Sequence, residues 1–229
     1  MRRIGLLGGM SWESSAEYYR LANELVRERL GGLHSADVLL ASVDFAPIAA
    51  LQRSGRWDET GELLADRARS LEAGGAEVLL LCTNTMHIVA EQVQGAVSIP
   101  LVHLVDVTAA AVRAKGLGSV GLLGTAFTME QPFYRDRLAA HGLTVHVPDA
   151  ADRATVHRVI YDELCLGVIR PESLQAYQRV IDRLVGRGAE GVVLGCTEIE
   201  LLVTDRDVEV PVFPTTRLHV EAAIDLALR

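Results

Sequence analysis

The chain has 229 residues, of which 49% are hydrophobic and 23% charged, and its formal net charge is −8. This balance is typical of a globular protein that forms one compact domain or two small lobes. The acidic charge, with no cluster of Lys or Arg, excludes the electrostatic footprint of a nucleic-acid-binding protein.

Short apolar runs alternate with stretches of helical periodicity along almost the whole chain. Apolar runs rich in Val, Ile and Leu are typical of strands buried in a parallel sheet. Residues 14–30 carry Tyr18, Leu21 and Leu25 at the spacing of one helix face. The sequence therefore predicts an α/β fold with parallel sheets flanked by helices. The expected strands lie near residues 3–8, 36–43, 77–81, 100–103, 119–123, 143–147, 191–195 and 211–213.

No stretch of the chain has the pattern of a membrane or export segment. The longest apolar run, residues 78–82, is far shorter than the roughly 20 residues that span a bilayer. The apolar stretch near the start is too short for a signal peptide. Three cysteines, an odd number with no CxxC pair, argue against both a disulfide framework and a zinc site. We expect a cytoplasmic protein with free thiols, no membrane partner and no metal.

The sequence repeats its own plan once. Three landmarks recur in the same order, 111 to 116 residues apart: a Gly-Leu-Leu-Gly element, an apolar run that ends in Cys-Thr, and a short apolar element with a central proline. Any two βα units share glycines and apolar strands, but that does not explain why Cys-Thr recurs at both strand ends. The paired segments are 5–8 with 121–124, 75–83 with 188–197, and 99–102 with 210–213.

The repeat predicts two pseudo-symmetric lobes. We expect the first lobe to cover residues 1–100 and the second 101–206, with 207–229 packing back on the first. Ligands of open parallel sheets bind outside the carboxyl ends of the strands. Both Cys-Thr pairs belong at such an edge, and an active site is expected in the cleft between the lobes.

Cys82 lies where an expected strand gives way to helical spacing. The residues that follow it, Thr83, Asn84 and Thr85, are types that cap helices, and the free N–H groups of a helix start can receive a carboxylate. A helix N-terminus also lowers the pKa of a cysteine. These residues therefore predict a thiolate at Cys82 and a substrate-binding turn beside it.

Cys196 repeats this arrangement after the run 191–195, and Thr197 with Glu200 matches a capping box. A single cysteine at a strand end is more often a small buried hydrophobe than a reactive group. Two cysteines at matched strand ends favour a catalytic role over a structural one. A base that removes a proton from one face of a carbon and an acid that delivers one to the other can invert that carbon without a cofactor, and a thiolate and a thiol can exchange these roles.

A cysteine paired with a histidine can also act as a nucleophile, and His87 lies five residues after Cys82. That spacing favours an imidazole directed away from the thiol. The glycine segment 5–14 fits no phosphate-binding motif, and neither does its echo, in which Thr128 and Gln131 match a capping box. We expect these loops to line the cleft, with Met10 and Thr125 among the binding residues.

The segments 4–11, 82–87 and 195–198 together resemble the aspartate/glutamate racemases, which work without pyridoxal phosphate. The resemblance covers essentially the whole chain. It implies a two-lobe α/β fold, no cofactor, and Cys82 and Cys196 as the two acid/base residues. It also implies that Thr83, Asn84 and Thr85 hold the α-carboxylate or amino group, with Thr197 in the matching position of the second lobe.

The resemblance also bears on the choice of amino acid. Residues Gln52 and Arg53 fall in a region similar to the family's substrate-contacting loop. Aspartate-specific relatives hold the side-chain carboxylate with a lysine near segment 161–167, where this chain has Cys165 and no lysine. Aspartate, glutamate and a broad range of amino acids all remain candidate substrates, and Cys165 is expected to serve packing.

Two other functions remain open. The chain could isomerise or decarboxylate a dicarboxylic acid, as other members of the superfamily do, or bind a small carboxylate without turnover. The expected partner is a small-molecule amino acid, and a homodimer is a candidate assembly because such dimers are common.

Overall fold

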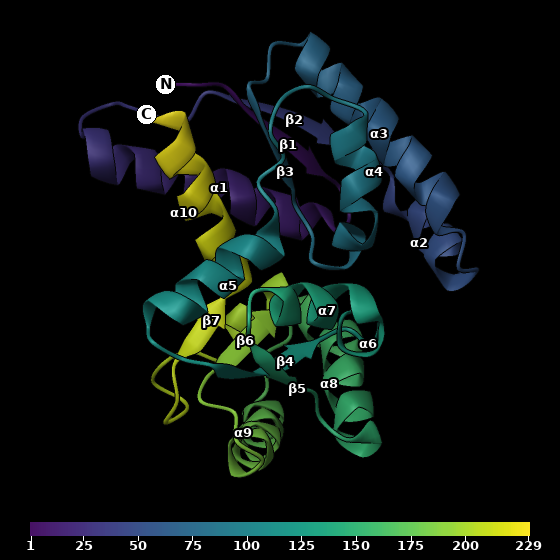
Figure 1. Cartoon of the computed structure of the whole chain (residues 1–229), viewed down its shortest axis with the longest axis vertical. Helices are drawn as coiled ribbons and strands as arrows, with labels where there is room; N and C mark the ends of the chain where they lie inside the picture. Colours follow the sequence, from purple (N-terminus) through teal and green to yellow (C-terminus); the bar gives the residue numbers. More distant parts are fainter. The chain divides into compact units, whose positions relative to one another are not determined.

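The computed structural model describes residues 1–229, and the chain divides into two compact units (Figure 1). The first unit is Met1–Leu104 with Thr216–Arg229, and the second is Val105–Thr215. No helix is long and apolar enough to cross a membrane.

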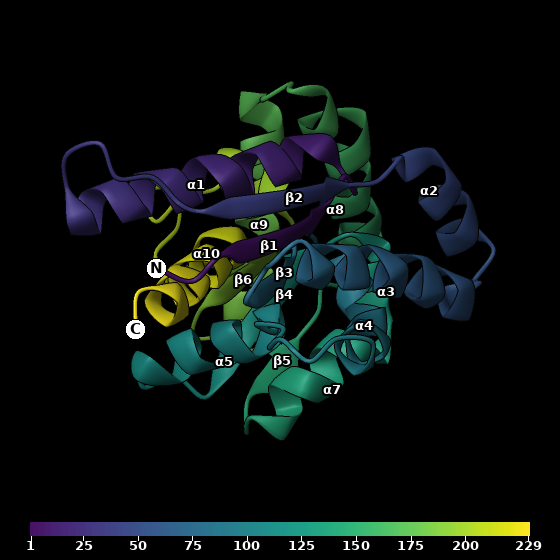
Figure 2. The ribbon, with the colours of Figure 1, turned by 90° about the horizontal axis from the view of Figure 1, so that it is seen from above.

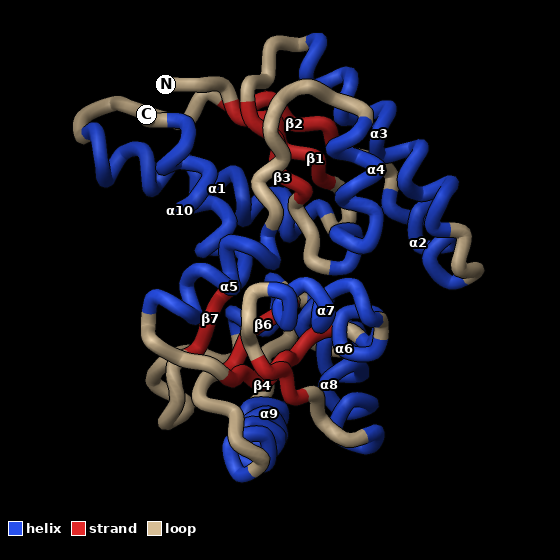
Figure 3. Tube along the Cα trace, viewed as in Figure 1, coloured by secondary structure: helices blue, strands red, loops and turns tan.

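The first unit is built on a parallel sheet of three strands in the order β2-β1-β3 (Figure 3). Its helices cover both faces, so every residue of β1 and β3 is buried. The elements in chain order are β1 (Ile4–Gly8), α1 (Trp12–Leu30), β2 (Val38–Ser42), α2 (Phe45–Arg53), α3 (Trp57–Ala73), β3 (Val78–Leu81), the 3-10 helix η1 (Thr85–Val89), α4 (Ala90–Gly95) and, from the end of the chain, α10 (Thr215–Ala227).

The second unit has four parallel strands in the order β5-β4-β6-β7. Its elements are α5 (Leu104–Ala114), β4 (Ser119–Gly124), α6 (Ala126–Glu130), α7 (Pro132–Ala140), β5 (Thr144–His146), α8 (Ala150–Asp162), η2 (Leu164–Leu166), α9 (Pro171–Gly186), β6 (Val192–Gly195), η3 (Thr197–Leu201) and β7 (Val212–Pro214). The α/β fold with two parallel sheets flanked by helices is therefore confirmed.

The internal repeat reappears in the sheets. β1 and β4 are matched in the repeat, as are β3 and β6. Within each sheet the two repeated strands are neighbours, β1 beside β3 in the first and β4 beside β6 in the second. The expected strand near 100–103 is wrong, since only an isolated bridge joins Leu79 to Leu101. α5 begins at Leu104, so the ladder ends after one residue. Its counterpart β7 forms a three-residue ladder with β6.

Alternate residues of β1 and β3 face opposite sides of their sheet, as strand geometry requires. Ile4 and Leu6 pack with α1 and α10 in one buried cluster, whereas Leu7 and Leu81 pack with α3 in another. Figure 2 shows α1 and α10 along the sheet of the first unit. Residues from the two ends of the chain therefore share one core.

A buried histidine joins α10 to α1. The Nε2 atom of His219 lies 2.6 Å from the carbonyl oxygen of Val102, and its Nδ1 atom lies 2.9 Å from the Tyr18 hydroxyl. Because a carbonyl only accepts, Nε2 carries the proton and Nδ1 accepts from Tyr18. The ring is neutral and fully buried, and burial lowers the pKa of His219 to about 3.

This depressed pKa predicts a pH-dependent stability. Below pH 6.5 the unfolded chain binds a proton at His219 that the folded chain does not, so stability is lost as the pH falls from about 6.5 toward 3. At pH 5 the loss is roughly 2 kcal/mol, at about 1.4 kcal/mol per pH unit. Urea unfolding at pH 7.5 and pH 5 measures this loss.

His219→Gln should shrink the difference in free energy of unfolding between the two pH values by that amount. His34→Gln, at an exposed position, should leave this difference unchanged. A His219→Gln variant with the full difference would contradict the assignment.

Candidate active site

Cys82 follows directly after β3, at the carboxyl edge of the first sheet. Its N–H donates to the Leu7 carbonyl at 2.9 Å, and its own carbonyl accepts from the Ser14 hydroxyl at 3.2 Å. The thiol lies 3.8 Å from the Leu80 carbonyl oxygen. The side chain is fully buried in the cluster that includes Val220 on α10. Strand β3, helix α1 and helix α10 thus fix the position of this residue.

The expected thiolate at Cys82 is wrong for the free protein. Burial raises the pKa of the Cys82 thiol well above its ordinary value. The helix after it is a 3-10 helix of five residues with Asn84 at its N-cap position, and the Asn84 side chain makes no capping bond. A single short turn adds little dipole, so desolvation decides the protonation state.

The three residues after Cys82 form one turn with it. Thr83 is half-buried, and Asn84 and Thr85 are 6% and 8% exposed. This turn therefore brings together four of the residues expected from the sequence.

Met10 and Gln52 reach this part of the first unit from two other segments. Met10 belongs to the same buried cluster as Met86, the residue after Thr85. Gln52 is 7% exposed, and its Nε2 atom lies 3.8 Å from the Met86 sulfur. Both expected binding residues are therefore buried, Met10 in the cluster that includes Met86 and Gln52 beside the Met86 sulfur. Arg53, by contrast, is exposed.

The glycine loop after β1 serves close packing. Gly9 has φ +94°, and its N–H donates to the Ser15 hydroxyl at 2.7 Å. A Cβ atom on Gly9 would lie 2.3 Å from the Val43 carbonyl oxygen. These glycines let β2 and α1 approach β1, and the Gly9 N–H is used within the loop itself.

Cys196 follows directly after β6, in the position that matches Cys82. It is half-buried, and its Sγ atom lies 2.8 Å from an oxygen of the Glu198 carboxylate, to which the thiol donates. Burial raises the pKa of Cys196 well above its ordinary value, and the Glu198 charge raises it further. The first residue of η3 is Thr197, with Cys196 at the N-cap position, so the expected capping box from Thr197 to Glu200 is wrong.

Thr125 lies at the same edge of the second sheet. Gly124 and Gly195 are partners across β4 and β6, so Thr125 and Cys196 are the next residues on adjacent strands. Thr125 is the N-cap of α6 and accepts from the Thr128 N–H at 3.4 Å, which corrects the expected box from Thr128 to Gln131. The second unit thus places Thr125, Cys196 and Thr197 together.

Sequence reasoning missed the part played by three residues. Ser14 and Glu198 contact the two cysteines directly, and Cys165 lies close enough to Cys196 that its charge would raise the Cys196 pKa. Cys165 is half-buried in η2 and packs on the cluster that Cys196 also contacts. The packing role expected for it is present, and it also lies beside the candidate site. The one sequence signal for Glu198 was its place two residues after the cysteine.

The hypothesis of a Cys82–His87 nucleophile has no support in the geometry. The His87 Nδ1 atom lies 2.8 Å from the Thr83 carbonyl oxygen, and its Nε2 atom lies 3.2 Å from the Leu104 nitrogen. Both ring nitrogens are bonded to backbone groups, so neither is aimed at the thiol as a base.

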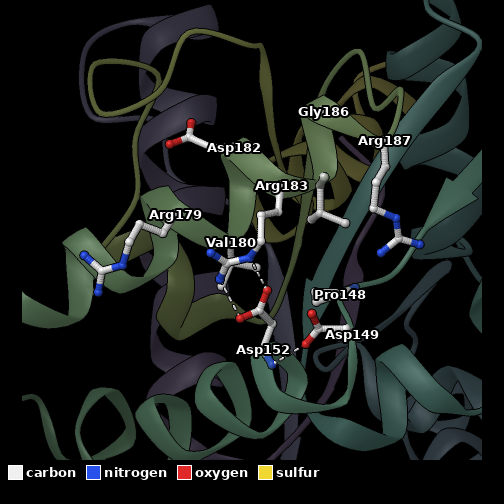
Figure 4. A pocket seen from close by; sticks show the side chains of 10 residues that line it. Pro148, Asp149, Asp152, Arg179, Val180, Asp182, Arg183, Gly186 and Arg187 are labelled. Atoms are coloured by element: carbon white, nitrogen blue, oxygen red, sulfur yellow. Dashed lines mark hydrogen bonds and ion pairs between the residues drawn. The ribbon is translucent and has the colours of Figure 1, made fainter.

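An open pocket of about 590 Å³ lies in the second unit, between α8 and α9 (Figure 4). The Asp152 carboxylate and the Arg183 guanidinium pair across it at 2.6 and 2.7 Å. The pocket surrounds the end of α9 that leads into the amino end of β6, whereas Cys196 follows the carboxyl end of that strand. It contains no residue of the candidate site. Its lining residues are Pro148, Asp149, Asp152, Arg179, Val180, Asp182, Arg183, Leu184, Gly186 and Arg187.

Comparison with known proteins matches this arrangement to one family. The sequence model of the Asp/Glu/Hydantoin racemases matches residues 7–223. The chain belongs to this racemase family. The match includes both Cys-Thr turns.

Individual members of the racemase family align over the full chain. The crystal structure of a proposed Asp/Glu racemase from Yersinia pestis superposes with a TM-score of 0.95 at 51% identity, covering 100% of both chains. That of PH1733, an aspartate racemase homologue from Pyrococcus horikoshii OT3, gives 0.90 at 33% identity, again over 100% of both. The broad specificity amino-acid racemase RacX from Bacillus subtilis (strain 168) is 22% identical over 229 residues, 98% of each chain.

The contact between Glu198 and Cys196 predicts a measurable pH effect in this racemase-family chain. Removing the carboxylate charge with Glu198→Gln should lower the pKa of Cys196, because that charge raises it. Alkylation of Cys196 by iodoacetamide, which requires the thiolate, should then begin at lower pH, as read by mass spectrometry. Glu200→Gln removes a charge from the same short helix and should leave the profile in place. An unchanged profile in Glu198→Gln would show that the contact does not control the thiol.

Proposed function

We propose that the chain racemises amino acids without a cofactor, with Cys82 and Cys196 as the two acid/base groups acting on one α-carbon. The observation that carries the proposal is the matched placement of the two thiols. Each cysteine follows the strand that pairs with the first strand of its own unit, β3 beside β1 and β6 beside β4. The family's span over residues 7–223 supports racemisation as the reaction class.

In the proposed reaction one cysteine acts as thiolate and takes the α-proton from one face of the substrate. The thiol of the other cysteine then delivers its own proton to the opposite face of the carbanion. The enzyme ends with the two protonation states exchanged, so the opposite enantiomer is converted by the reverse roles. A proton shuttled between two thiols needs no oxidant, reductant or cofactor.

The raised pKa values of both cysteines suit a demanding proton transfer. The α-proton of an amino acid is far less acidic than a thiol, so a desolvated and therefore more basic thiolate is the better base. The cost is a small thiolate fraction at neutral pH. The rate is therefore expected to rise as the pH increases from 7 toward 9.

The proposed substrate range is broad. The chain has a single lysine, Lys115, which lies outside segment 161–167, where aspartate-specific relatives place the lysine that holds the side-chain carboxylate. Cys165 occupies that segment, beside Cys196. The absence of that lysine favours amino acids with uncharged side chains alongside the acidic ones.

Exchange of the α-hydrogen with solvent tests the proposal. The protein is incubated in deuterated water with the L and D forms of aspartate, glutamate, alanine and serine, without added cofactor. Loss of the α-proton signal in NMR spectra and the appearance of the opposite enantiomer on chiral chromatography are expected for at least one pair. If no acidic or neutral amino acid gains deuterium, the proposal fails.

A further inference from the structure

His87 lies five residues after Cys82 and takes no part in the proposed proton transfers. It is 4% exposed. Its bonds define its protonation, since the Thr83 carbonyl can only accept and the Leu104 N–H can only donate. The ring therefore carries its proton on Nδ1 and a lone pair on Nε2, so it is a neutral imidazole that bridges two backbone groups.

The bond to Thr83 completes the backbone of the cysteine turn. The N–H of Cys82 is held by Leu7, its carbonyl by Ser14, and the N–H of Thr83 by the Leu81 carbonyl at 2.8 Å. The Thr83 carbonyl is held by the His87 ring, because the backbone N–H of His87 goes to Asn84 instead, at 3.1 Å. Four consecutive backbone groups are thus fixed, and the last depends on one imidazole.

Neighbouring rings hold the imidazole itself. The ring of His87 lies 4.7 Å from that of His103 and 5.6 Å from that of His219, both in edge-on orientations. Its Nε2 atom is anchored at Leu104, the last residue of the first unit before the chain crosses to the second. The ring cannot turn without losing two hydrogen bonds and these contacts together.

We propose that His87 is a positioning residue for Cys82, whose Nδ1–H holds the turn that aims the thiol at the α-carbon. This inference rests on the acid/base role proposed for Cys82. Proton transfer slows sharply when the general base is displaced from its productive position. The hydrogen bond from His87 to Thr83 therefore governs the half-reaction in which Cys82 removes the proton. The half-reaction in which Cys196 removes the proton does not depend on it.

Two matched substitutions separate the two bonds. The side-chain amide of Asn reaches the position of Nδ1 and can donate to the Thr83 carbonyl, whereas that of Gln reaches the position of Nε2 and can accept from Leu104. His87→Asn therefore keeps the hydrogen bond to the Thr83 carbonyl and loses the one from the Leu104 N–H. His87→Gln keeps the hydrogen bond from Leu104 and loses the one to Thr83. Urea unfolding of both variants shows whether either has lost the fold.

The readout is exchange of each enantiomer in deuterated water. Steady-state kcat/KM is unsuitable because an equilibrium constant of one forces equal values in the two directions, whereas exchange on a single face is free of that constraint. A Cys196→Ala variant, which retains only Cys82 as base, first identifies the enantiomer that Cys82 deprotonates. In otherwise wild-type protein, His87→Gln should slow exchange of that enantiomer between about 10- and 100-fold and leave the other within about twofold. His87→Asn should stay within about threefold for both.

Other results overturn the inference. Equal losses for both enantiomers, or equal losses in the Asn and Gln variants, would make His87 an ordinary core residue. If the wild-type protein exchanges neither enantiomer, the proposed function fails first. The rate at which iodoacetamide alkylates Cys82 then still tests the positioning role. This alkylation rate should change in His87→Gln and stay the same in His87→Asn. An unchanged alkylation rate in both variants refutes the positioning role.

Discussion

Replacing either Cys82 or Cys196 with alanine should abolish racemisation, lowering its rate by about 10³-fold or more. Each variant removes the group proposed to serve one face of the α-carbon. The carbanion can then be formed from one enantiomer only and can be reprotonated only from the face it left. The two variants should therefore fail in complementary ways.

The complementary pattern is the decisive measurement. In deuterated water, Cys82→Ala should exchange the α-hydrogen of one enantiomer with retention of configuration, and Cys196→Ala that of the other. Cys165→Ala, at the third free cysteine, is the matched control and should retain racemisation in both directions. If one cysteine variant still interconverted the enantiomers at close to the wild-type rate, a two-thiol mechanism would be excluded.

The second large effect concerns the fold around the glycine loop. Gly9→Ala should destabilise the chain by about 4 kcal/mol or more, at the severe end for single substitutions. An added Cβ would meet the Val43 carbonyl oxygen at 2.3 Å and the Val43 nitrogen at 2.4 Å, and φ at this residue is +94°. Val43 donates its N–H to the Gly8 carbonyl at 3.0 Å, so strand β2 cannot move away without breaking its pairing with β1.

A control at Gly55 separates steric clash from backbone strain. Gly55 has φ +68° with no atom within 4 Å of an added Cβ. Gly55→Ala should therefore cost only about 1 kcal/mol, the usual penalty of a left-handed conformation. Urea unfolding of the two variants measures the difference. Equal costs at Gly9 and Gly55 would mean that β2 yields to the added methyl group.

Local sequence pattern predicted the strands well, because buried parallel strands appear in the sequence as continuous apolar runs. The repeat matched β1 with β4 and β3 with β6, whereas the strand order within each sheet came only from the structure. The local pattern did not predict the protonation of Cys82. Burial of that thiol depends on Val220 and its neighbours in α10, more than 130 residues away. No window of sequence around Cys82 contains this information.

The turns after the two cysteines show a second limit. Helical spacing and cap-type residues predicted helix starts at Thr83 and Thr197, and both segments became short 3-10 helices instead. The Ser14 hydroxyl that binds the Cys82 carbonyl comes from α1, 68 residues earlier. Spacing within a segment indicates that a polar side chain is present, whereas its partner is decided by tertiary packing.

The discontinuous first unit has a consequence for synthesis of the protein. A ribosome releases residues in chain order, and domains generally fold as units as they emerge. The second unit, Val105–Thr215, is continuous and emerges complete, whereas the first lacks α10 until the helix that carries His219 and Val220 has left the exit tunnel. During translation the buried face that includes Cys82 therefore waits for its last helix until the whole second unit has emerged.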